Sequence, residues 1–234
     1  MTKFNWITRI IISFFLAIFF LVAPVNSHIT HYKDLKKIEM EIFKDDKLIG
    51  YNYYFFTKEN GFIIVKNQLN FKLSLFGIDV LKIEGYGEEK YKNNKLISYE
   101  SKTLQNDKKK FVNLVYLAET NEFNIKGSSY SGLANVNNIV GNWWNHQILQ
   151  ANSQISPISG SIKEQVVTFL AKEKIVIYGK TIDVDHFKLT SKDMSIPKEK
   201  RLDFDIWYDN KNSMIVKVTY SRMGNWEYRL KSFE

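Results

Sequence analysis

Residues 65–75 read VKNQLNFKLSL, and this stretch decides the fold class. Apolar side chains occupy positions 65, 69, 71, 73 and 75, whereas lysine, glutamine, asparagine and serine occupy positions 66, 68, 70, 72 and 74. Successive side chains of a β-strand point to opposite faces of its sheet. The alternation therefore predicts a long antiparallel strand that buries one face and exposes the other to water.

The same period of two recurs on both sides of this stretch. Residues 38–42 alternate isoleucine and methionine with glutamate, and residues 202–231 hold three further alternating segments. Asn60-Gly61 is the sharpest hairpin signal in the chain. Turns at intervals of about eight to twelve residues are typical of a sandwich or barrel. We therefore expect an all-β fold of ten or eleven strands, a single antiparallel meander curved into an open or closed barrel of lipocalin-like or half-barrel form.

Residues 127–160 interrupt the alternation, because serine, asparagine and glycine dominate there. A segment of this length inside a compact domain is usually functional or a joint between domains, and neither flank looks self-sufficient. We expect one domain with a long central loop that carries a short helix near residues 142–150. Residues 162–170 fit a helix or a strand, and a change of phase near Asp185-His186 indicates a β-bulge.

The first 27 residues differ from the rest of the chain. Lys3 and Arg9 accompany an apolar run at residues 10–22, and small residues follow at 25–27. This order is typical of a secretory signal peptide, with a retained N-terminal anchor as the alternative. We expect a signal peptide at residues 1–27, one β-rich domain at residues 28–234, and a periplasmic or secreted location after cleavage.

Composition and charge exclude several classes of function. The chain has 234 residues and no cysteine, which removes disulfides, cysteine-ligated metals and thiol nucleophiles. Its net charge is +8, but the lysines are scattered and arginine occurs only at positions 9, 201, 222 and 229. Nucleic-acid readers use concentrated basic stripes, so we expect no nucleic-acid partner. The charge does not exclude weak peripheral contact with an anionic envelope membrane.

Six short motifs carry a family resemblance. They read DKLIG at 46–50, EKYKNNKL at 89–96, WN at 144–145, PISG at 157–160, IWYD at 206–209 and YRL at 228–230. Together they resemble an uncharacterised family of secreted, β-rich Gram-negative proteins, domain-of-unknown-function family 6134. The resemblance implies an extracytoplasmic β-fold and brings no catalytic residues, because the family has no established activity. His146 follows Trp144-Asn145, where a proline is commoner in the family.

No motif converges on a hydrolytic or metal site. The stretch GSSYSG at residues 127–132 misses the Gly-x-Ser-x-Gly elbow of serine hydrolases by one position. Asp183, Asp185 and His186 lie on one expected strand, where neighbouring side chains point to opposite faces. A solvated strand edge accounts for these three residues better than a metal site.

Acid–base and copper chemistry each have one weak candidate. Asp203 and Asp205 share a face, but their equal environments give neither carboxyl a reason to shift its pKa. They are expected to pair with Lys217 or Arg229 across the sheet. Cleavage after residue 27 would make His28 the N-terminus, whose amine and imidazole nitrogens suit copper(II). A loose terminal segment is the simpler interpretation of His28, and we expect no cofactor.

The aromatic residues are the most informative functional signal. Residues 51–56 carry aromatic side chains on both faces of one expected strand, and Trp143 and Trp144 lie in the central loop. Aromatics fill cores, but they also line the ligand cavities of larger barrels. The side chains expected to contact a ligand are Tyr51, Tyr53, Phe55, Trp143, Trp144, His146 and Trp207.

Two functions from different classes follow from these features. The first is a non-enzymatic binding or carrier protein for a lipid or another apolar or amphipathic small molecule, released by movement of residues 127–160. The second is an envelope interaction or structural protein with a solid core, whose partner docks on a strand edge. A copper enzyme that uses His28 is a remote third. A cavity of several hundred Å³ beside Trp143 or Trp144 would favour the first function.

Overall fold

The alternating segments form one large β-sheet. The computed structural model describes residue 32 and residues 34–234 apart from residue 223, so the predicted signal peptide at 1–27 and His28 lie outside the described residues. In chain order the strands are β1 (Lys37–Lys44), β2 (Lys47–Glu59), β3 (Phe62–Leu75), β4 (Ile78–Lys92), β5 (Lys95–Gln105), β6 (Lys108–Leu117), β7 (Glu122–Gly127), β8 (Ser131–Asn135), β9 (Ile139–Val140), β10 (Ser153–Ile155), β11 (Ile162–Ile177), β12 (Lys180–Ser191), β13 (Asp203–Asp209), β14 (Met214–Ser221) and β15 (Asn225–Phe233).

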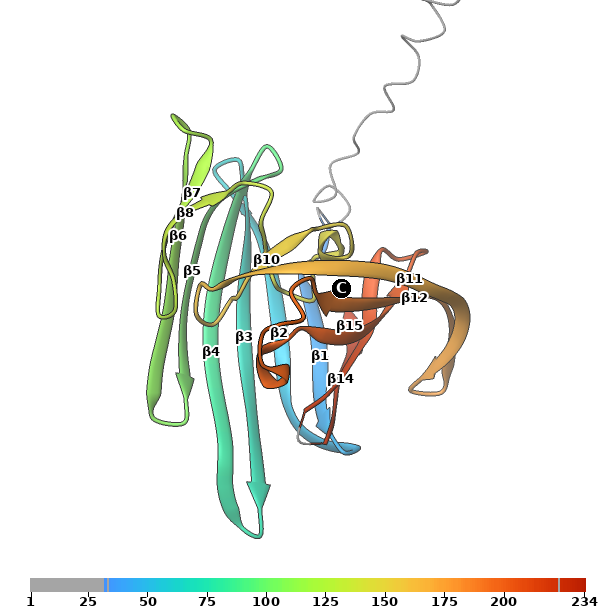
Figure 1. Cartoon of the computed structure of the whole chain (residues 1–234). Coiled ribbons are helices and arrows are strands. Elements are labelled where there is room, and N and C mark those ends of the chain that lie inside the picture. Colours follow the sequence, from blue (N-terminus) through green and yellow to red (C-terminus); the bar gives the residue numbers. More distant parts are fainter. Residues whose placement is uncertain (1–31, 33, 223) are drawn as a thin grey trace, which may run out of the picture.

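Strand order in the sheet follows the chain almost throughout. The order is β8-β7-β6-β5-β4-β3-β2-β1-β15-β14-β13-β12-β11-β10-β9. Neighbours are antiparallel apart from β9 and β10, which run parallel. The sheet curls so that the arm of β3–β8 faces the arm of β11–β15 across a hollow (Figure 1). Strands β8 and β9 are the two ends of this order, so the sheet is not closed into a barrel.

The hairpin turns carry the residues that the sequence predicts for them. Asn60-Gly61 joins β2 to β3 with φ angles of 50° and 78°, and Asn93-Asn94 joins β4 to β5 with 49° and 65°. Two successive positive φ angles define the tight turn that matches the twist of paired strands, and asparagine and glycine tolerate them best. The meander prediction is confirmed for this part of the chain.

The central stretch differs most from the prediction. Residues 127–160 hold the short strands β8, β9 and β10 instead of one long loop, and the expected helix is a single 3-10 turn, η2 (His146–Leu149). A second 3-10 turn, η3 (Lys198–Lys200), lies between β12 and β13. Residues 162–170, which fitted a helix or a strand, belong to β11. The expected ten or eleven strands were too few, because strands of two to five residues are too short to show alternation.

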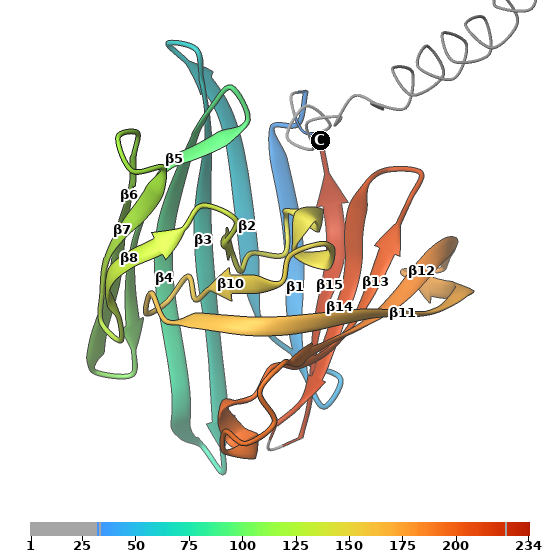
Figure 2. The same cartoon turned by 45° about the horizontal axis from the view of Figure 1, so that its top comes forward.

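The bulge predicted near Asp185-His186 lies on the neighbouring strand. The pairing of β11 with β12 shifts between Phe169 and Ala171, opposite Phe187 and His186. An extra residue on one strand of an antiparallel pair bends that strand and increases its twist. The long β11 accordingly curves across the hollow (Figure 2).

Residues 139–155, here called the inner segment, lie inside the curl. They run across the concave face of the sheet between the two arms (Figure 2). Trp144 and Ile148 of the inner segment are buried, with 1% and 0% of their surfaces exposed. The inner segment thus divides the hollow into a packed part around Trp144 and an open part.

Candidate binding cavity

The packed part of the hollow is organised around a buried carboxylate. Glu89 lies on the concave face of β4 with 2% of its surface exposed. Its Oε1 accepts hydrogen bonds from Trp144 Nε1 at 2.8 Å and Asn142 Nδ2 at 2.7 Å, and its Oε2 accepts one from the Tyr91 hydroxyl. Burial raises the pKa of the Glu89 carboxyl, and these three donors partly offset that rise. Glu89 therefore ties the inner segment to the sheet.

Aromatic packing completes this attachment. The Trp144 ring meets Tyr32, Phe56 and Tyr91 edge-on, with ring centroids 5.2, 5.4 and 5.9 Å apart. Edge-to-face contacts of this kind add about 0.5–1.5 kcal/mol each beyond the burial of area. His146 is buried and shares a short hydrogen bond with the Tyr32 hydroxyl. Trp144 and His146 thus belong to the packed core.

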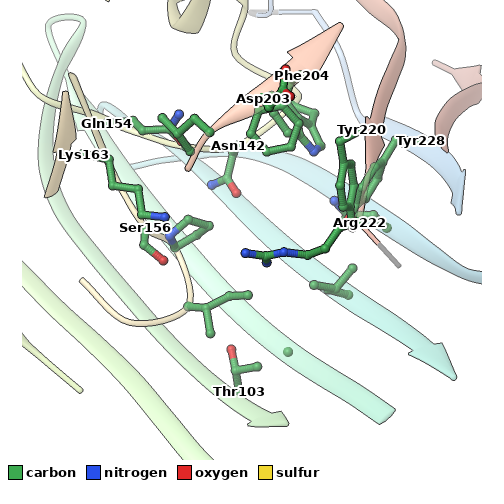
Figure 3. Close-up of a pocket in the computed structure, with 18 of the residues that line it drawn as sticks. Thr103, Asn142, Gln154, Ser156, Lys163, Asp203, Phe204, Tyr220, Arg222 and Tyr228 are labelled. Atoms are coloured by element: carbon green, nitrogen blue, oxygen red, sulfur yellow. The ribbon is translucent and has the colours of Figure 1, made fainter. Parts of the chain in front are cut away.

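The open part of the hollow is a cavity of about 950 Å³. It lies between the concave face of β2–β5 and the strands β13–β15, and the inner segment forms its roof (Figure 3). Binding pockets for small molecules usually span roughly 300–1,000 Å³. The cavity is therefore large enough to hold one lipid-sized molecule.

The two walls of the cavity differ in chemistry. On one side, Trp143 contacts Phe204 and Tyr228 with ring centroids 5.1 and 6.2 Å apart, and Phe204 contacts Tyr220 at 5.4 Å. These four rings form an apolar wall, here called the aromatic wall. The opposite wall combines small or polar residues with three tyrosines and comprises Asn52, Tyr54, Asn67, Leu69, Gly85, Tyr86, Tyr99, Ser101 and Thr103.

Two cations reach into the cavity from opposite sides. Lys163 extends from β11 and Arg222 from the turn after β14, each toward the middle of the space (Figure 3). The Lys163 ammonium donates to the Lys200 carbonyl oxygen at 2.8 Å. Burial, with a smaller contribution from the nearby positive charge of Arg222, lowers the pKa of Lys163. The positive charges of the two side chains therefore repel each other within the cavity.

Neither cation has an acidic partner in the described part of the chain. The ion pairs found there involve neither Lys163 nor Arg222. Asp203 lines the same cavity, but Lys188 holds its carboxylate at 2.7 Å. Arg201 also lines the space, and its Nε donates to the Ile196 carbonyl oxygen at 2.7 Å. The cavity lining as a whole holds four basic side chains, Lys163, Lys198, Arg201 and Arg222, and two acidic ones, Glu199 and Asp203.

The structure separates the residues that the sequence grouped as ligand contacts. Trp143 lines the cavity, whereas Trp144 and His146 lie beside it in the packed core. All three sit on the inner segment, as the sequence placed them, and only Trp143 faces the open space. Within residues 127–160, whose movement was expected to release a ligand, Asn142 and Trp144 are bonded to Glu89.

The remaining aromatic candidates lie on the convex face of the sheet. Tyr51, Tyr53 and Phe55 stack along β2 with centroids 5.8 and 6.1 Å apart, so none of them lines the cavity. The alternation of β2 instead turns the side chains of residues 52, 54 and 56 inward. Trp207 likewise stacks on His186 at 4.4 Å, away from the cavity lining.

Sequence reasoning missed the cations and the polar wall. Arg222 and Lys163 are 59 positions apart in the chain, in a turn and on a strand that meet only because the sheet curls. No spacing rule links such positions. The sequence does contain a signal for Glu89. Residues 85, 87, 89 and 91 share one face of β4, and two glycines and a buried tyrosine accompany Glu89 on that face.

The other acid and base candidates form surface ion pairs. Asp203 and Asp205 both pair with Lys188, at 2.7 and 2.8 Å, and not with Lys217 or Arg229 as expected. The reason is that β13 pairs with β12 on that side, and Lys188 lies directly opposite Asp205. The stretch at residues 127–132 forms the end of β7 and the turn into β8.

The histidine and aspartates on β12 are also satisfied by neighbours. Asp183 and Asp185 pair with Lys174 and Lys172, and His186 lies between Glu173 and Asp205. Within the described residues, no group of three or more histidine, cysteine, aspartate or glutamate side chains could hold a metal ion. Nor does that part of the chain contain a helix long and apolar enough to cross a membrane.

The fold and the cavity together define a class: an all-β protein with one open, curled sheet around a lipid-sized hollow. The family described as "Domain of unknown function (DUF6134)" matches residues 40–231, and the chain belongs to this family. The match confirms the family resemblance that the short motifs carry. No curated protein matches the chain.

Proposed function

We propose that this chain is an exported, non-enzymatic binding or carrier protein whose cavity holds one amphipathic anion. The observation that supports the proposal is that one space holds an aromatic wall and two cations, Lys163 and Arg222, which have no acidic partner among the described residues. A charged head between the two cations and an apolar tail along Trp143, Phe204 and Tyr228 would use both features.

The electrostatic cost of the charged Lys163 side chain supports an anionic guest. Desolvation by burial disfavours the charged form of Lys163, and the like charge of Arg222 adds to that penalty. An anionic head would relieve both effects, because hydrogen bonds between charged partners are roughly twice as strong as neutral ones. A purely apolar guest would leave the two cations without a partner.

The cavity also helps to distinguish between the two functions expected from the sequence. An interaction protein with a solid core needs no internal space, whereas a carrier needs several hundred Å³ beside an aromatic surface. The observed volume of about 950 Å³ and the position of Trp143 on its wall favour the carrier. Export remains part of the proposal and rests on the signal-like residues 1–27.

Titration with three detergents and lipids of similar chain length tests the proposal. Palmitate, hexadecyl maltoside and hexadecyltrimethylammonium have the same chain length and differ in head charge, and isothermal calorimetry measures each affinity. We expect palmitate to bind at least ten-fold more tightly than the uncharged probe, and the cation to bind least. Equal affinities would contradict the role of the two cations, and no binding of any probe would contradict the carrier.

A variant identifies the place of binding. Trp143 lies on the cavity wall and Trp207 on the convex face, so Trp143→Phe should abolish the change of tryptophan emission on palmitate binding. Trp207→Phe is the matched control and should preserve that change. Native mass spectrometry of the protein purified from its own cell envelope would then name the guest, and its intact mass would show where the exported chain begins.

A further inference from the structure

One end of the molecule carries an unusually exposed apolar hairpin tip. Strands β3 and β4 meet at Phe76-Gly77, and Phe76 exposes 104% of its reference surface. Ile78 and Val80 follow with 70% and 43% exposed. We call Phe76, Ile78 and Val80 the apolar tip. Single exposed apolar residues are ordinary on protein surfaces, but three at the end of one hairpin form a patch that water solvates poorly.

The turn itself is costly for its sequence. Phe76 and Gly77 have φ angles of 51° and 79°, the left-handed values that a two-residue hairpin turn requires. Asparagine, aspartate and glycine adopt these values readily, whereas a bulky residue there is uncommon. The corresponding turns at Asn60-Gly61 and Asn93-Asn94 use the favourable residues. Phe76 is therefore a poor choice for the turn and gains no burial in exchange.

The aromatic residue of a second hairpin turn, in contrast, packs on the sheet. Tyr178-Gly179, between β11 and β12, has φ angles of 48° and 76°. The Tyr178 hydroxyl donates to the Glu41 carboxylate, and the Lys231 ammonium lies 4.8 Å from the ring centroid. Tyr178 thus returns to the sheet and packs on it. Phe76 points away from the protein, so an external partner is the simplest use for its ring.

The apolar tip projects beyond its neighbours. The turn between β5 and β6 lies level with Lys82, because Asn106 N donates to the Lys82 carbonyl oxygen at 2.8 Å. Ile78 is four residues further along β4, about 13 Å at the usual rise of a strand. Figure 1 shows the β3–β4 hairpin reaching furthest at this end of the sheet. The tip can therefore enter a soft surface before the body of the protein meets it.

Three basic residues lie on one side of the base of the hairpin. Lys108, Lys109 and Lys110 begin β6, next to the turn that lies level with Lys82. Lys108 and Lys109 are exposed, and Lys110 is half-buried. Lysines held behind an apolar tip match the layered chemistry of a bilayer, in which charged head groups lie several ångströms above the hydrocarbon.

One residue of the cavity wall, Arg222, lies at the same end of the sheet. Arg222 lies in the turn between β14 and β15, and Asn225 N in that turn donates to Asp45 Oδ1 at 2.7 Å, in the turn between β1 and β2. The β1–β2 and β3–β4 turns share one end of the sheet, because Ile42 pairs with Gly50 and Gly50 with Phe71. A surface that receives the apolar tip would consequently face the turn that carries Arg222.

We propose that the apolar tip inserts into the interfacial region of an anionic lipid bilayer and docks this end of the protein on it. The lysines at the base of the hairpin bind the lipid head groups while Phe76 and Ile78 enter the acyl boundary. Such binding is weak and reversible, since a few apolar side chains give marginal membrane affinity unless basic residues add to it. The proposal does not rest on the guest of the cavity.

Flotation with vesicles tests the docking. Vesicles of phosphatidylcholine with phosphatidylglycerol provide the anionic surface, and pure phosphatidylcholine provides the neutral one. We expect the full exported chain to float with anionic vesicles and about ten-fold less with neutral ones. Phe76→Asn combined with Ile78→Thr should reduce flotation at least five-fold, and asparagine suits the φ of position 76, so folding should be preserved.

The second aromatic hairpin provides the matched control. Val176→Thr makes a comparable apolar-to-polar change at the β11–β12 tip, where Val176 is 69% exposed, and leaves the packed Tyr178 in place. This control should float like the unmodified chain. Loss of flotation in the control but not in the β3–β4 variant would overturn the proposal, as would absence of flotation in the unmodified chain. Palmitate affinity in solution should be unchanged in both variants, which keeps this test separate from that of the carrier function.

A site-specific label gives a second readout. The chain has no cysteine, so Ile78→Cys carries a single environment-sensitive nitrobenzoxadiazole probe. Its emission should shift to the blue with anionic vesicles. A probe at Asn94→Cys, in the β4–β5 turn at the opposite end of the same strand, should not shift. A shift at position 94 without one at position 78 would overturn the assignment.

Discussion

The two parts of the hollow enclose polar groups in opposite ways. Around Glu89, every oxygen of the carboxylate accepts a hydrogen bond, and aromatic rings exclude water. In the cavity, Lys163 and Arg222 face each other with no acidic partner in the described chain. Both parts are covered by the same inner segment and the same sheet. The packed part therefore contributes to the stability of the fold, while the open part is where we propose that a guest binds.

One short stretch of the inner segment contacts both parts of the hollow. Asn142 and Trp144 of the inner segment bond to Glu89, while Trp143 between them points into the cavity. Trp143 and Trp144 form a turn, and their side chains leave it toward different parts of the hollow. Three consecutive residues therefore connect the stability of the core to the shape of the binding space.

Glu89→Ala should have the largest effect. It leaves the buried Nε1 of Trp144 and Nδ2 of Asn142 without an acceptor, and each unsatisfied donor costs about 1–3 kcal/mol. We expect the free energy of unfolding to fall by roughly 3–5 kcal/mol, measured by urea denaturation. Glu84→Ala on the same strand removes an exposed carboxylate that pairs with Lys82 and should change stability by less than about 0.5 kcal/mol. Similar losses in both variants would contradict the role of Glu89.

A matched pair of Leu→Phe substitutions distinguishes packed from open space. Leu114 on β6 is fully buried, so Leu114→Phe should overpack the core and cost about 1–3 kcal/mol. Leu69 on β3 lines the cavity, so Leu69→Phe should cost less than about 0.5 kcal/mol because its ring extends into free volume. The same ring should weaken palmitate binding. Equal costs at the two positions would show that the cavity does not exist in solution.

Arg222→Gln should weaken binding without weakening the fold. Losing one charge-assisted hydrogen bond to an anion costs about 1.5 kcal/mol, close to a ten-fold loss of palmitate affinity. Lys211→Gln, an exposed lysine after β13, is the control and should leave that affinity unchanged. Arg222→Gln should also raise the pKa of Lys163, since Arg222 lowers it. Palmitate affinity, which falls as Lys163 loses its proton, should then persist to higher pH in the variant.

The smallest effect is expected from Glu89→Gln at acidic pH. The amide oxygen can accept from Trp144 and Asn142, and the amide nitrogen can donate to the Tyr91 hydroxyl. Burial raises the pKa of Glu89 in the folded state. The resulting contribution of Glu89 to the free energy of unfolding is therefore complete below the unfolded pKa of about 4.3 and is lost as pH rises through the folded pKa. Glutamine does not titrate. Urea denaturation across pH should therefore show equal stabilities in acid and a more stable variant in alkali.

Much of the fold could be predicted because its signals are local. The alternation at residues 65–75 fixes the faces of β3, and Asn60-Gly61 fixes the turn before it. The prediction failed at residues 127–160, where β9 has two residues and β10 has three. Strands that short are held by long-range contacts, such as Trp144 with Glu89, and not by their own sequence pattern.

The site was predicted only in part for a related reason. Trp143 was found because a tryptophan in an irregular segment is conspicuous. Tyr51 and Tyr53 were chosen from β2 by composition alone, and the phase of that strand against Tyr54, which is fully buried, decides that they face outward. The meeting of Lys163 with Arg222 depends on the curvature of the sheet, which no local pattern encodes.

The pairing of β1 with β15 has a consequence for assembly. Met40 lies opposite Leu230, so the seam in the middle of the sheet joins segments 190 positions apart. The hairpins on either side can form as soon as their own residues are available, but closing so long a loop carries an entropic cost before its contacts repay it. The last strand, β15, must therefore pair with β1 before the two arms form one sheet. Until then, each arm presents a bare edge that is prone to aggregation, and a chain that crosses a membrane from its N-terminus would need shelter during that interval.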